Sequence, residues 1–415
     1  MALTCRKWTT GVGLTKLGNK MTSKQNLVAI VNAGSATLKF SLLGVEDTAL
    51  RVLIERLGSG GEEGPRAVIK DSSGYSVFDG PVPASNHQEA LTWLFDWIAQ
   101  ESPSLKPVAV GHRVVHGGDN LQKPILVTPE VMHEIETLIP LAPLHQPHNL
   151  SPIRFIADKF PELPQVACFD TAFHATQSKI ERMFALPREW SGKGIKRYGF
   201  HGLSYEYIAS QLPGIDPLAA KGRTIVCHLG NGASLCGLRA GQSIATTMAF
   251  TALEGLPMGT RCGSIDPGVL LYLLDQEKLA VKELSDMLYK CSGLLGISGV
   301  SSDMRDLLTD PSEQAAEAVE YFCYRIARAI GSLAAALGGL DALVFTGGIG
   351  EHAAPVRARI CELSQWLGIA VDHEANQEDR IALQSTQSSI KVLVIPTNEE
   401  RMIAMHVRQL IDTPR

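Results

Sequence analysis

Six short segments combine His, Arg, Asp, Asn or Glu with Gly or Pro, a composition suited to binding anions. Imidazole, guanidinium and glycine-turn N–H groups commonly hold phosphate and carboxylate oxygens. The segments are residues 110–119 (VGHRVVHGGD), 142–149 (APLHQPHN), 167–174 (ACFDTAFH), 197–207 (RYGFHGLSYEY), 253–268 (LEGLPMGTRCGSIDPG) and 395–405 (IPTNEERMIAM). Each also has a structural interpretation, because a strand-end Asp often caps a helix and a loop Arg often forms a surface ion pair. Together they favour a ligand site, since open α/β sheets bind ligands at strand ends.

Three glycine-rich breaks interrupt apolar strands. Residues 224–238 (TIVCHLGNGASLCGL) and 27–43 (LVAIVNAGSATLKFSLL) share a strand–turn–strand plan, and residues 342–360 place Gly-Gly-Ile-Gly between a strand and a helix pattern. Asn-Gly alone predicts an ordinary hairpin, but glycine turns also cradle phosphate. Because Gly34 and Gly232 lie almost half the chain apart, the repeat predicts a duplicated α/β domain whose glycine turns face one cleft.

Familiar metal and nucleotide motifs are absent from the sequence. No H-E-x-x-H pair occurs, and neither G-x-x-x-x-G-K-[ST] nor G-x-G-x-x-G is present. Residues 191–196 (SGKGIK) come nearest to a phosphate loop but lack its Ser or Thr. A site of another design is therefore expected.

Helix and strand patterns alternate along the chain, which predicts α/β layers. Helical patterns lie near residues 86–100, 129–139, 203–212, 266–276, 281–290, 313–337, 353–367 and 399–411. Strand patterns lie near residues 107–111, 164–169, 223–229, 342–346 and 390–395.

Composition sets the class of protein. The 415 residues suffice for two or more domains, and 45% hydrophobic with 20% charged residues is ordinary for a soluble protein. A net charge of −5 gives no reason to expect nucleic-acid binding. The eight Cys contain no C-x-x-C pair, which favours reduced thiols in a cytoplasm. We expect no membrane span, because the apolar stretch 327–345 contains Asp341 and several glycines.

The first residues stand apart. Residues 1–25 contain five basic residues and no acidic one, and the first acid is Glu46. A transit peptide has a similar bias. Because an Arg-rich amphipathic pattern is lacking, we expect residues 1–23 to be a flexible extension, or a start upstream of a true start at Met21.

These motifs identify a family. From about residue 27 to 411 the chain resembles the acetate kinase family of the sugar-kinase/actin superfamily. The resemblance rests on ten segments in the family's order, which are NAGSATLKF, GHRVVHGG, APLHQPHN, FDTAFH, RYGFHG, CHLGNGAS, MGTR, GVSSDMRD, FTGGIGE and PTNEE. It implies two duplicated lobes of ribonuclease H-like type with ATP in the cleft between them.

The resemblance also implies roles for particular residues. For catalysis it indicates Asp170, His201, Arg261 and His145. Of these, His201 and Arg261 would bind the transferring phosphoryl group, and His145 would lie nearby. For the carboxylate substrate it indicates Arg113, and for the substrate's alkyl end Val115, Leu144, Phe200 and Ala252. For Mg²⁺, with Mn²⁺ as an alternative, it indicates Asn32 and Glu399. For ATP or ADP it indicates Lys39, His228, Leu229, Gly230, Asn231, Gly232, Asp303, Met304, Arg305, Gly347, Gly348, Ile349, Gly350 and Glu351.

The same resemblance implies an organisation and a reaction. One lobe would comprise residues 24–171 with 399–415 and the other residues 172–398, in a cytoplasmic homodimer that binds neither nucleic acid nor membrane. The reaction would be Mg²⁺-dependent, reversible, direct in-line transfer of the γ-phosphoryl group of ATP to acetate. A short-chain acid is already ionised at pH 7, so this chemistry needs charge neutralisation rather than a strong base.

Several positions depart from the family pattern and leave alternatives open. Leu203 and Tyr205 follow His201 where the family has Thr and His, and Cys262 and Ser264 follow Arg261 where it has Ser and Asp. These changes put the local support of His201 and Arg261 in doubt. Ala252 replaces a common Pro, so a propionate or other short-chain acid kinase is one alternative. A non-catalytic ATP-gated binding protein is another.

Overall fold

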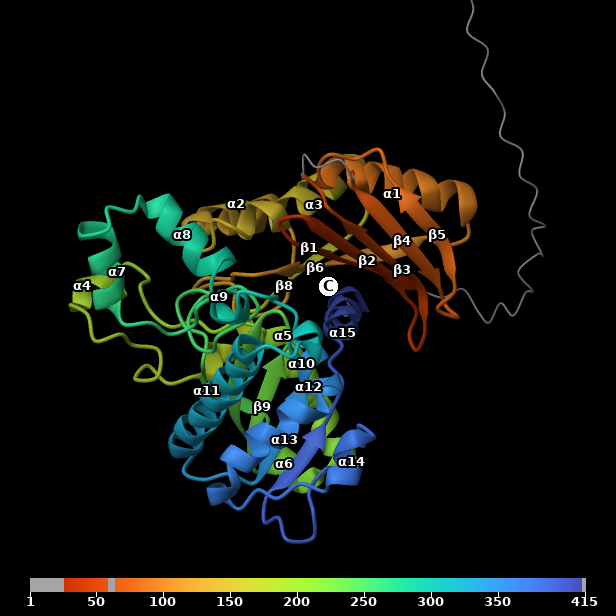
Figure 1. The fold of residues 1–415 in the computed structure, drawn as a ribbon. Coiled ribbons are helices and arrows are strands. Elements are labelled where there is room, and N and C mark those ends of the chain that lie inside the picture. The colour runs from red at the N-terminus through yellow and green to blue at the C-terminus, as the bar shows by residue number, and fades with distance from the viewer. Residues whose placement is uncertain (1–25, 59–63, 413–415) are drawn as a thin grey trace, which may run out of the picture.

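The computed structural model describes residues 26–58 and 64–412 as two α/β bodies, each built on its own sheet (Figure 1). The expectation for residues 1–23 lies outside the described residues. The strands are β1 Leu27–Ala33, β2 Thr37–Leu43, β3 Thr48–Glu55, β4 Arg66–Asp71, β5 Ser76–Pro81, β6 Pro107–Val114, β7 Ile125–Leu126, β8 Gln165–Phe169, β9 Arg223–Leu229, β10 Ala233–Arg239, β11 Gln242–Thr246, β12 Ala342–Thr346 and β13 Lys391–Val394.

Fifteen α-helices and three 3₁₀ helices are described. The α-helices are α1 His87–Glu101, α2 Pro129–Thr137, α3 Gln146–Lys159, α4 Arg188–Gly192, α5 Gly202–Ile215, α6 Pro217–Lys221, α7 Pro267–Asp275, α8 Val281–Lys290, α9 Gly293–Ser298, α10 Met304–Thr309, α11 Glu313–Leu337, α12 Gly347–His352, α13 Ala354–Leu363, α14 His373–Gln377 and α15 Glu399–Asp412. The 3₁₀ helices are η1 Ile139–Leu141, η2 Ala172–Thr176 and η3 Gln365–Leu367.

The two sheets contain the same five-stranded unit. The first has the order β5-β4-β3-β2-β1-β6-β8-β7, and the second has the order β11-β10-β9-β12-β13. In both, an antiparallel hairpin (β1–β2 or β9–β10) is extended by a third antiparallel strand (β3 or β11). On the other side, two parallel strands follow (β6 and β8, or β12 and β13). The expected duplicated α/β fold of two lobes is therefore confirmed.

Strand composition follows burial. In β1 (LVAIVNA) six of the seven residues are buried, as expected for a central strand covered on both faces. In β2, Phe40 and Leu42 pack with residues of α1, whereas Ser41 on the opposite face donates a hydrogen bond of 2.8 Å to Glu400 at the start of α15. Helices α1 and α3 thus cover one face of the first sheet and α15 covers the other, between that sheet and α5 (Figure 1).

The helix ends explain why the expected helices form. The 25-residue helix α11 begins after Ser312, whose side chain accepts from the N–H of Ala315, and ends at Gly338 in the left-handed conformation. The eight expected helices and five expected strands are all present, with small shifts at their ends. The pattern at 353–367 corresponds to α13 followed by η3.

Helix α3 and strands β3, β4 and β5 are the longer elements of the first body that were not predicted. Helix α3 contains Pro147 in its first turn, where a missing N–H costs nothing, and Pro152 inside the helix. Strands β3, β4 and β5 form the edge of the first sheet. Buried and exposed residues largely alternate in β3 and β4, and that period of two is the signal that would have found them.

Two further expectations concern cysteines and membranes. The seven cysteines among the described residues are all free thiols. Within the described part of the chain, no helix is both long and apolar enough to cross a bilayer.

Replacing Gly111 with Ala should destabilise the fold, because α15 packs directly against this residue of β6. A Cβ at position 111 would lie 2.8 Å from Cγ2 of Val407 and closer still to Ile403. Overpacking of this kind costs about 1–3 kcal/mol. Urea unfolding gives the free energy, and Gly214→Ala is the matched control because its Cβ would meet no atom within 4 Å. Equal free energies for the two variants would contradict the prediction.

Candidate active site

A bidentate ion pair lies at the ends of two neighbouring parallel strands. Arg113 lies in β6, and Asp170 immediately follows β8. Arg113 donates from Nε to Oδ1 of Asp170 at 3.0 Å and from Nη2 to Oδ2 at 2.6 Å. The Asp170 side chain is 2% exposed and that of Arg113 is 21% exposed. Burial raises the pKa of Asp170 and the Arg113 guanidinium opposes that rise. Two short bonds to a permanent cation favour the carboxylate form.

Two further side-chain oxygen atoms lie near the same guanidinium. Nη1 of Arg113 donates to Oδ1 of Asn32 in β1 at 3.2 Å, and Oε2 of Glu399, the first residue of α15, lies 4.0 Å from Nε. Burial alone would lower the pKa of Arg113, but the charges of Asp170 and Glu399 outweigh it and raise that pKa. A carboxylate beside an amide oxygen fits Mg²⁺, which keeps several waters and takes its other ligands from substrate phosphates. Asn32 and Glu399 would hold such an ion.

His201 is tied to this ion pair through the backbone. The N–H of Gly202 donates to the carbonyl oxygen of Asp170 at 2.9 Å, which fixes the start of α5. His201 precedes it in the left-handed conformation, with φ of 58°, which is uncommon for a residue with a side chain. Such backbone strain is frequent at functional sites.

His201 stacks on His228 of β9. Their ring centroids lie 4.4 Å apart with an angle of 30° between the planes. Nδ1 of His201 is hydrogen-bonded to Oγ of Ser234 at 2.9 Å, and Nδ1 of His228 to Oγ of Ser204 at 2.8 Å. Burial lowers the pKa of His228 to about 4 and lowers that of His201 well below its usual value. Both rings are therefore neutral at pH 7.

Arg261 approaches this pair from a loop. Its Nη1 donates to the carbonyl oxygen of Ala252 at 3.1 Å, and Sδ of Met258 lies 3.7 Å away. Among the described residues no carboxylate forms an ion pair with Arg261, and burial lowers its pKa. Backbone hydrogen bonds from Ser292, Leu294 and Leu295 hold residues 258–260. A rigidly held, uncompensated cation is a site for an anion.

The turn of the β9–β10 hairpin completes the arrangement. A Cβ built on Gly232 would lie 3.2 Å from Nε2 of His201 and 3.8 Å from Nη1 of Arg261. A Cβ on Gly230 would lie 3.9 Å from the backbone nitrogen of Gly348, at the start of α12. The two glycine turns of the second body are therefore neighbours, and the first of them faces both His201 and Arg261.

His145 lies within electrostatic range of both arginines. It precedes α3, and burial, followed by the charges of Arg261 and Arg113, lowers its pKa to about 4. Asp170, His201, Arg261, Arg113 and His145 thus come from five separate segments and meet at one place.

The residues expected at the substrate's alkyl end differ in burial. Val115 and Phe200 are 5% and 2% exposed and share one core cluster, against which Ala252 packs. Leu144 is 42% exposed and stands outside that cluster. Three of the four thus lie in or against one large core cluster, and Leu144 does not.

The residues expected around the nucleotide also divide. Asp303 caps α10 and binds the exposed side chain of Arg305, whereas Met304 is 3% exposed and packs in the core. Glu351 accepts from the N–H groups of Gly347 at 2.8 Å and of Thr397 at 3.1 Å, so its carboxylate joins α12 to the segment between β13 and α15. Lys39 pairs with Asn32 across the β1–β2 hairpin and lines a surface hollow with Glu400.

The departures from the family pattern are supported locally. Tyr205 is buried and its hydroxyl is hydrogen-bonded to Ser234, while Leu203 packs in the core with Ile403 of α15. Oγ of Ser264 donates to Glu254 at 2.8 Å. Cys262 is held through its N–H by the carbonyl oxygen of Leu288.

Sequence reasoning missed three hydroxyl residues, which are Ser204, Ser234 and Thr397. Oγ of Ser204 contacts Oγ1 of Thr397 at 2.8 Å as well as His228. All three lie inside segments that were singled out for other residues, but contacts over 24 to 193 positions leave no local pattern.

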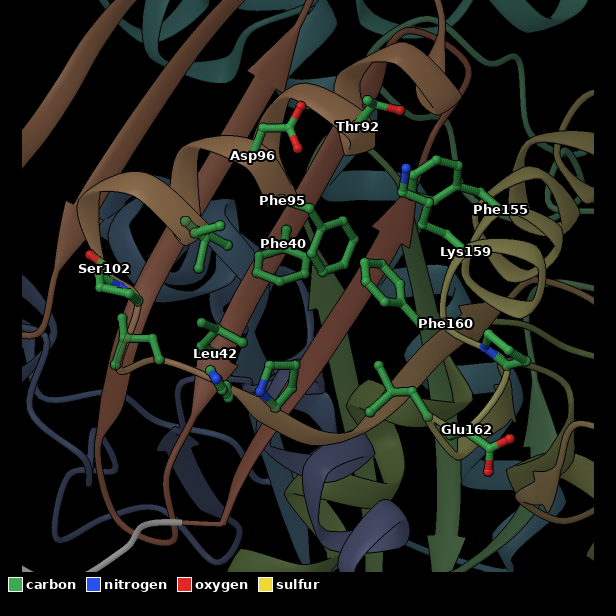
Figure 2. A pocket seen from close by; sticks show the side chains of 18 residues that line it. Phe40, Leu42, Thr92, Phe95, Asp96, Ser102, Phe155, Lys159, Phe160 and Glu162 are labelled. Atoms are coloured by element: carbon green, nitrogen blue, oxygen red, sulfur yellow. The ribbon is translucent and has the colours of Figure 1, made fainter.

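A cavity of about 810 Å³ lies elsewhere, between α1, α3 and β2. Figure 2 shows the rings of Phe40, Phe95, Phe155 and Phe160 gathered along it, with Lys159 and Asp96 at its edge. Because Phe40 faces away from the Ser41 side of β2, this cavity is separate from the arginine and histidine cluster.

Comparisons with known proteins agree with this geometry. The model of the acetokinase family matches residues 27–405. The acetate kinase of Rhodopseudomonas palustris (strain ATCC BAA-98 / CGA009) is 50% identical over 94% of this chain and 100% of the relative. The crystal structure of a propionate kinase from Francisella tularensis has a TM-score of 0.87 at 38% identity, over 92% of this chain and 98% of that one. That of Porphyromonas gingivalis acetate kinase has a TM-score of 0.85 at 36% identity, over 93% and 100%.

Lowering the pH from 7 to 5 should destabilise the fold through three buried histidines. His112, His116 and His174 are 1%, 0% and 1% exposed, and burial lowers the pKa of each to about 4. Unfolded histidines titrate near pH 6.5, so between about 6.5 and 4 the unfolded chain binds more protons. The free energy of unfolding should therefore fall with pH, by about 1–2 kcal/mol per histidine at pH 5.

Urea unfolding at pH 7, 6 and 5 measures this loss. Because burial rather than ion pairing lowers these pKa values, the loss should persist when NaCl is raised from 0.1 to 0.5 M. A free energy that does not change across this pH range would contradict the prediction.

Proposed function

We propose that this chain, which belongs to the acetokinase family by its match over residues 27–405, transfers the γ-phosphoryl group of ATP to acetate. The products are acetyl phosphate and ADP, and the reaction is reversible. The observation that carries the proposal is that Arg261 and the neutral His201 both lie next to the Gly232 turn. Among the described residues, Arg261 has no carboxylate partner.

The residue types suit direct transfer. Acetate has a pKa near that of a Glu side chain, about 4.3, so at pH 7 it is already a nucleophile and needs no base. The difficulty is to bring one anion against the phosphates of another. In this proposal Arg261 would neutralise the transferring group, His201 would donate a hydrogen bond to it, and Arg113 would hold the carboxylate. No covalent phospho-enzyme is required.

Mg²⁺ belongs to the proposal as the partner of ATP. When bound it would supply positive charge to the phosphates, and the side-chain oxygens of Asn32 and Glu399 would hold it. Mn²⁺ has similar ligand preferences. Assays across Mg²⁺ concentrations, in unaltered protein and in Glu399→Ala, test this assignment.

The nucleotide is proposed to lie along the glycine turns of the second body. His228, Leu229, Gly230, Asn231 and Gly232 would contact phosphates, with Lys39 near them from the first body. Gly347, Gly348, Ile349, Gly350 and the start of α10 (residues 303–305) would face the adenosine. The proposed lobes are 24–171 with 399–415, and 172–398, and their closure on ATP would exclude water.

A homodimer is the proposed assembly. Helix α7 carries Val269, Leu271 and Tyr272 and has no buried residue, with Leu271 67% exposed. A helix this apolar is normally covered by a partner. The free thiols fit a reducing cytoplasm. Sedimentation of the purified protein measures the oligomeric state.

A propionate kinase is the second candidate, favoured by the similarity to the Francisella tularensis enzyme. One methylene changes discrimination by only about 10- to 200-fold, so the pocket's walls decide. Val115 is β-branched and is buried in the core cluster that also contains Phe200, and a stiff side chain here would favour the methyl group of acetate.

Arg261→Ala should lower kcat by roughly 10³ or more with a smaller change in the KM for ATP, as expected for an arginine that acts in a phosphoryl-transfer transition state. Hydroxylamine trapping of acetyl phosphate measures the reaction. Arg154→Ala is the control, because Arg154 forms an exposed ion pair with Glu136. A loss of tenfold or less would make Arg261 a loop anchor, and no trapped product from unaltered protein would overturn the proposed function.

Val115→Ala should narrow or reverse the preference for acetate over propionate, because the smaller side chain frees space at the alkyl end. The measurement is kcat/KM for a panel of short-chain acids. Val108→Ala is the control, since Val108 is 40% exposed. If unaltered protein prefers propionate, or if the ratio does not change, Val115 is not the gate and Ala252 becomes the better candidate.

A further inference from the structure

We propose that Tyr205 is a positioning residue that acts through Ser234 to hold His201 as the neutral tautomer with its hydrogen on Nε2. That N–H is the donor to the transferring phosphoryl group, so the proposal rests on the proposed function for its catalytic consequence. Tyr205 stands where the family commonly has His, and its role here follows from its own contacts.

The contacts form a short buried chain. The hydroxyl of Tyr205 lies 2.5 Å from Oγ of Ser234, and Oγ of Ser234 lies 2.9 Å from Nδ1 of His201. Tyr205 and Ser234 are both 0% exposed. Tyr205 is one helical turn after His201 in α5, and its N–H donates to the carbonyl oxygen of His201 at 3.1 Å. One turn of helix therefore sets both ends of the chain.

The direction of the hydrogen bonds fixes the tautomer. Burial raises the pKa of Tyr205 well above its usual value, so its hydroxyl keeps its hydrogen and can donate. When it donates to Ser234, the hydroxyl hydrogen of Ser234 is left to bind Nδ1 of His201. A neutral imidazole that accepts at Nδ1 carries its hydrogen on Nε2. Nε2 is the atom next to the Gly232 turn and near Arg261.

The neighbouring histidine has the same arrangement. Thr397, Ser204 and Nδ1 of His228 form a second chain of hydroxyls beside the first. The two rings stack at 4.4 Å, close to Arg113 and Arg261, where two imidazolium charges would repel. Fixed neutral tautomers supply N–H donors at this place without added charge.

A simpler role for Tyr205 is packing, because its ring belongs to the core cluster that contains Val226 and Cys236. Tyr205→Phe separates the two roles, since it keeps the ring and removes the hydroxyl. Ser234→Ala removes the middle of the chain from the other side. Tyr207→Phe is the matched control, because this partly buried tyrosine of the same helix packs against the core cluster that contains Leu203 as well as the one that contains Tyr205.

The first readout is the nitrogen chemical shifts of His201 in protein labelled with ¹⁵N-histidine and assigned with His201→Gln. We expect the Nε2–H tautomer in unaltered protein and in Tyr207→Phe. Both Tyr205→Phe and Ser234→Ala should shift His201 toward the Nδ1–H tautomer or a mixture. This readout needs no activity, so it remains valid even if no acetyl phosphate is formed.

The second readout is kinetic. Tyr205→Phe should lower kcat about 3- to 10-fold, the range that one hydrogen bond gives, with little change in the KM for ATP. Because the two residues act in one chain, the double variant should lose no more than Ser234→Ala alone. The proposal is overturned if unaltered His201 carries its hydrogen on Nδ1, or if both single variants leave the tautomer unchanged. Additive losses in the double variant would also overturn it.

Discussion

The bidentate pair between Arg113 and Asp170 is the interaction on which the site depends. It joins β6 to the end of β8, and the carbonyl oxygen of Asp170 then holds Gly202 and so the start of α5. This hydrogen bond also fixes the position of His201, which directly precedes Gly202. Loss of Arg113 would leave the buried carboxylate of Asp170 without a compensating charge, which typically costs about 3–5 kcal/mol. The pair is therefore both a structural joint and the support for the site.

The two arginines of the site differ in whether a carboxylate compensates their charge. Asp170 compensates Arg113, whereas Arg261 has a carbonyl oxygen and a sulfur atom as its described partners. The imidazoles of His201 and His228 remain neutral because they are buried. One arginine can thus hold its position before substrate arrives, and the other presents its charge to an incoming anion.

Much of this arrangement was predictable from sequence, and the remainder has physical causes. The glycine turns, the capped helix α11 and the strand-end Arg113 and Asp170 all have local signals. Helix α3 was missed because two prolines argue against it, although the first falls where a helix tolerates it. Ser234 was missed because its partners lie 29 and 33 positions away. Likewise, only packing reveals that Met304 is in the core and that Leu144 is exposed.

The position of α15 has a consequence for how the chain is made. This helix covers one face of the first sheet, and its Glu400 binds Ser41 across 359 positions. During synthesis, the sheet that begins at residue 27 must wait for the last helix to emerge before that face is covered. The second body, encoded between them, can meanwhile fold on contacts of its own. The first lobe to be translated is thus the last to be completed.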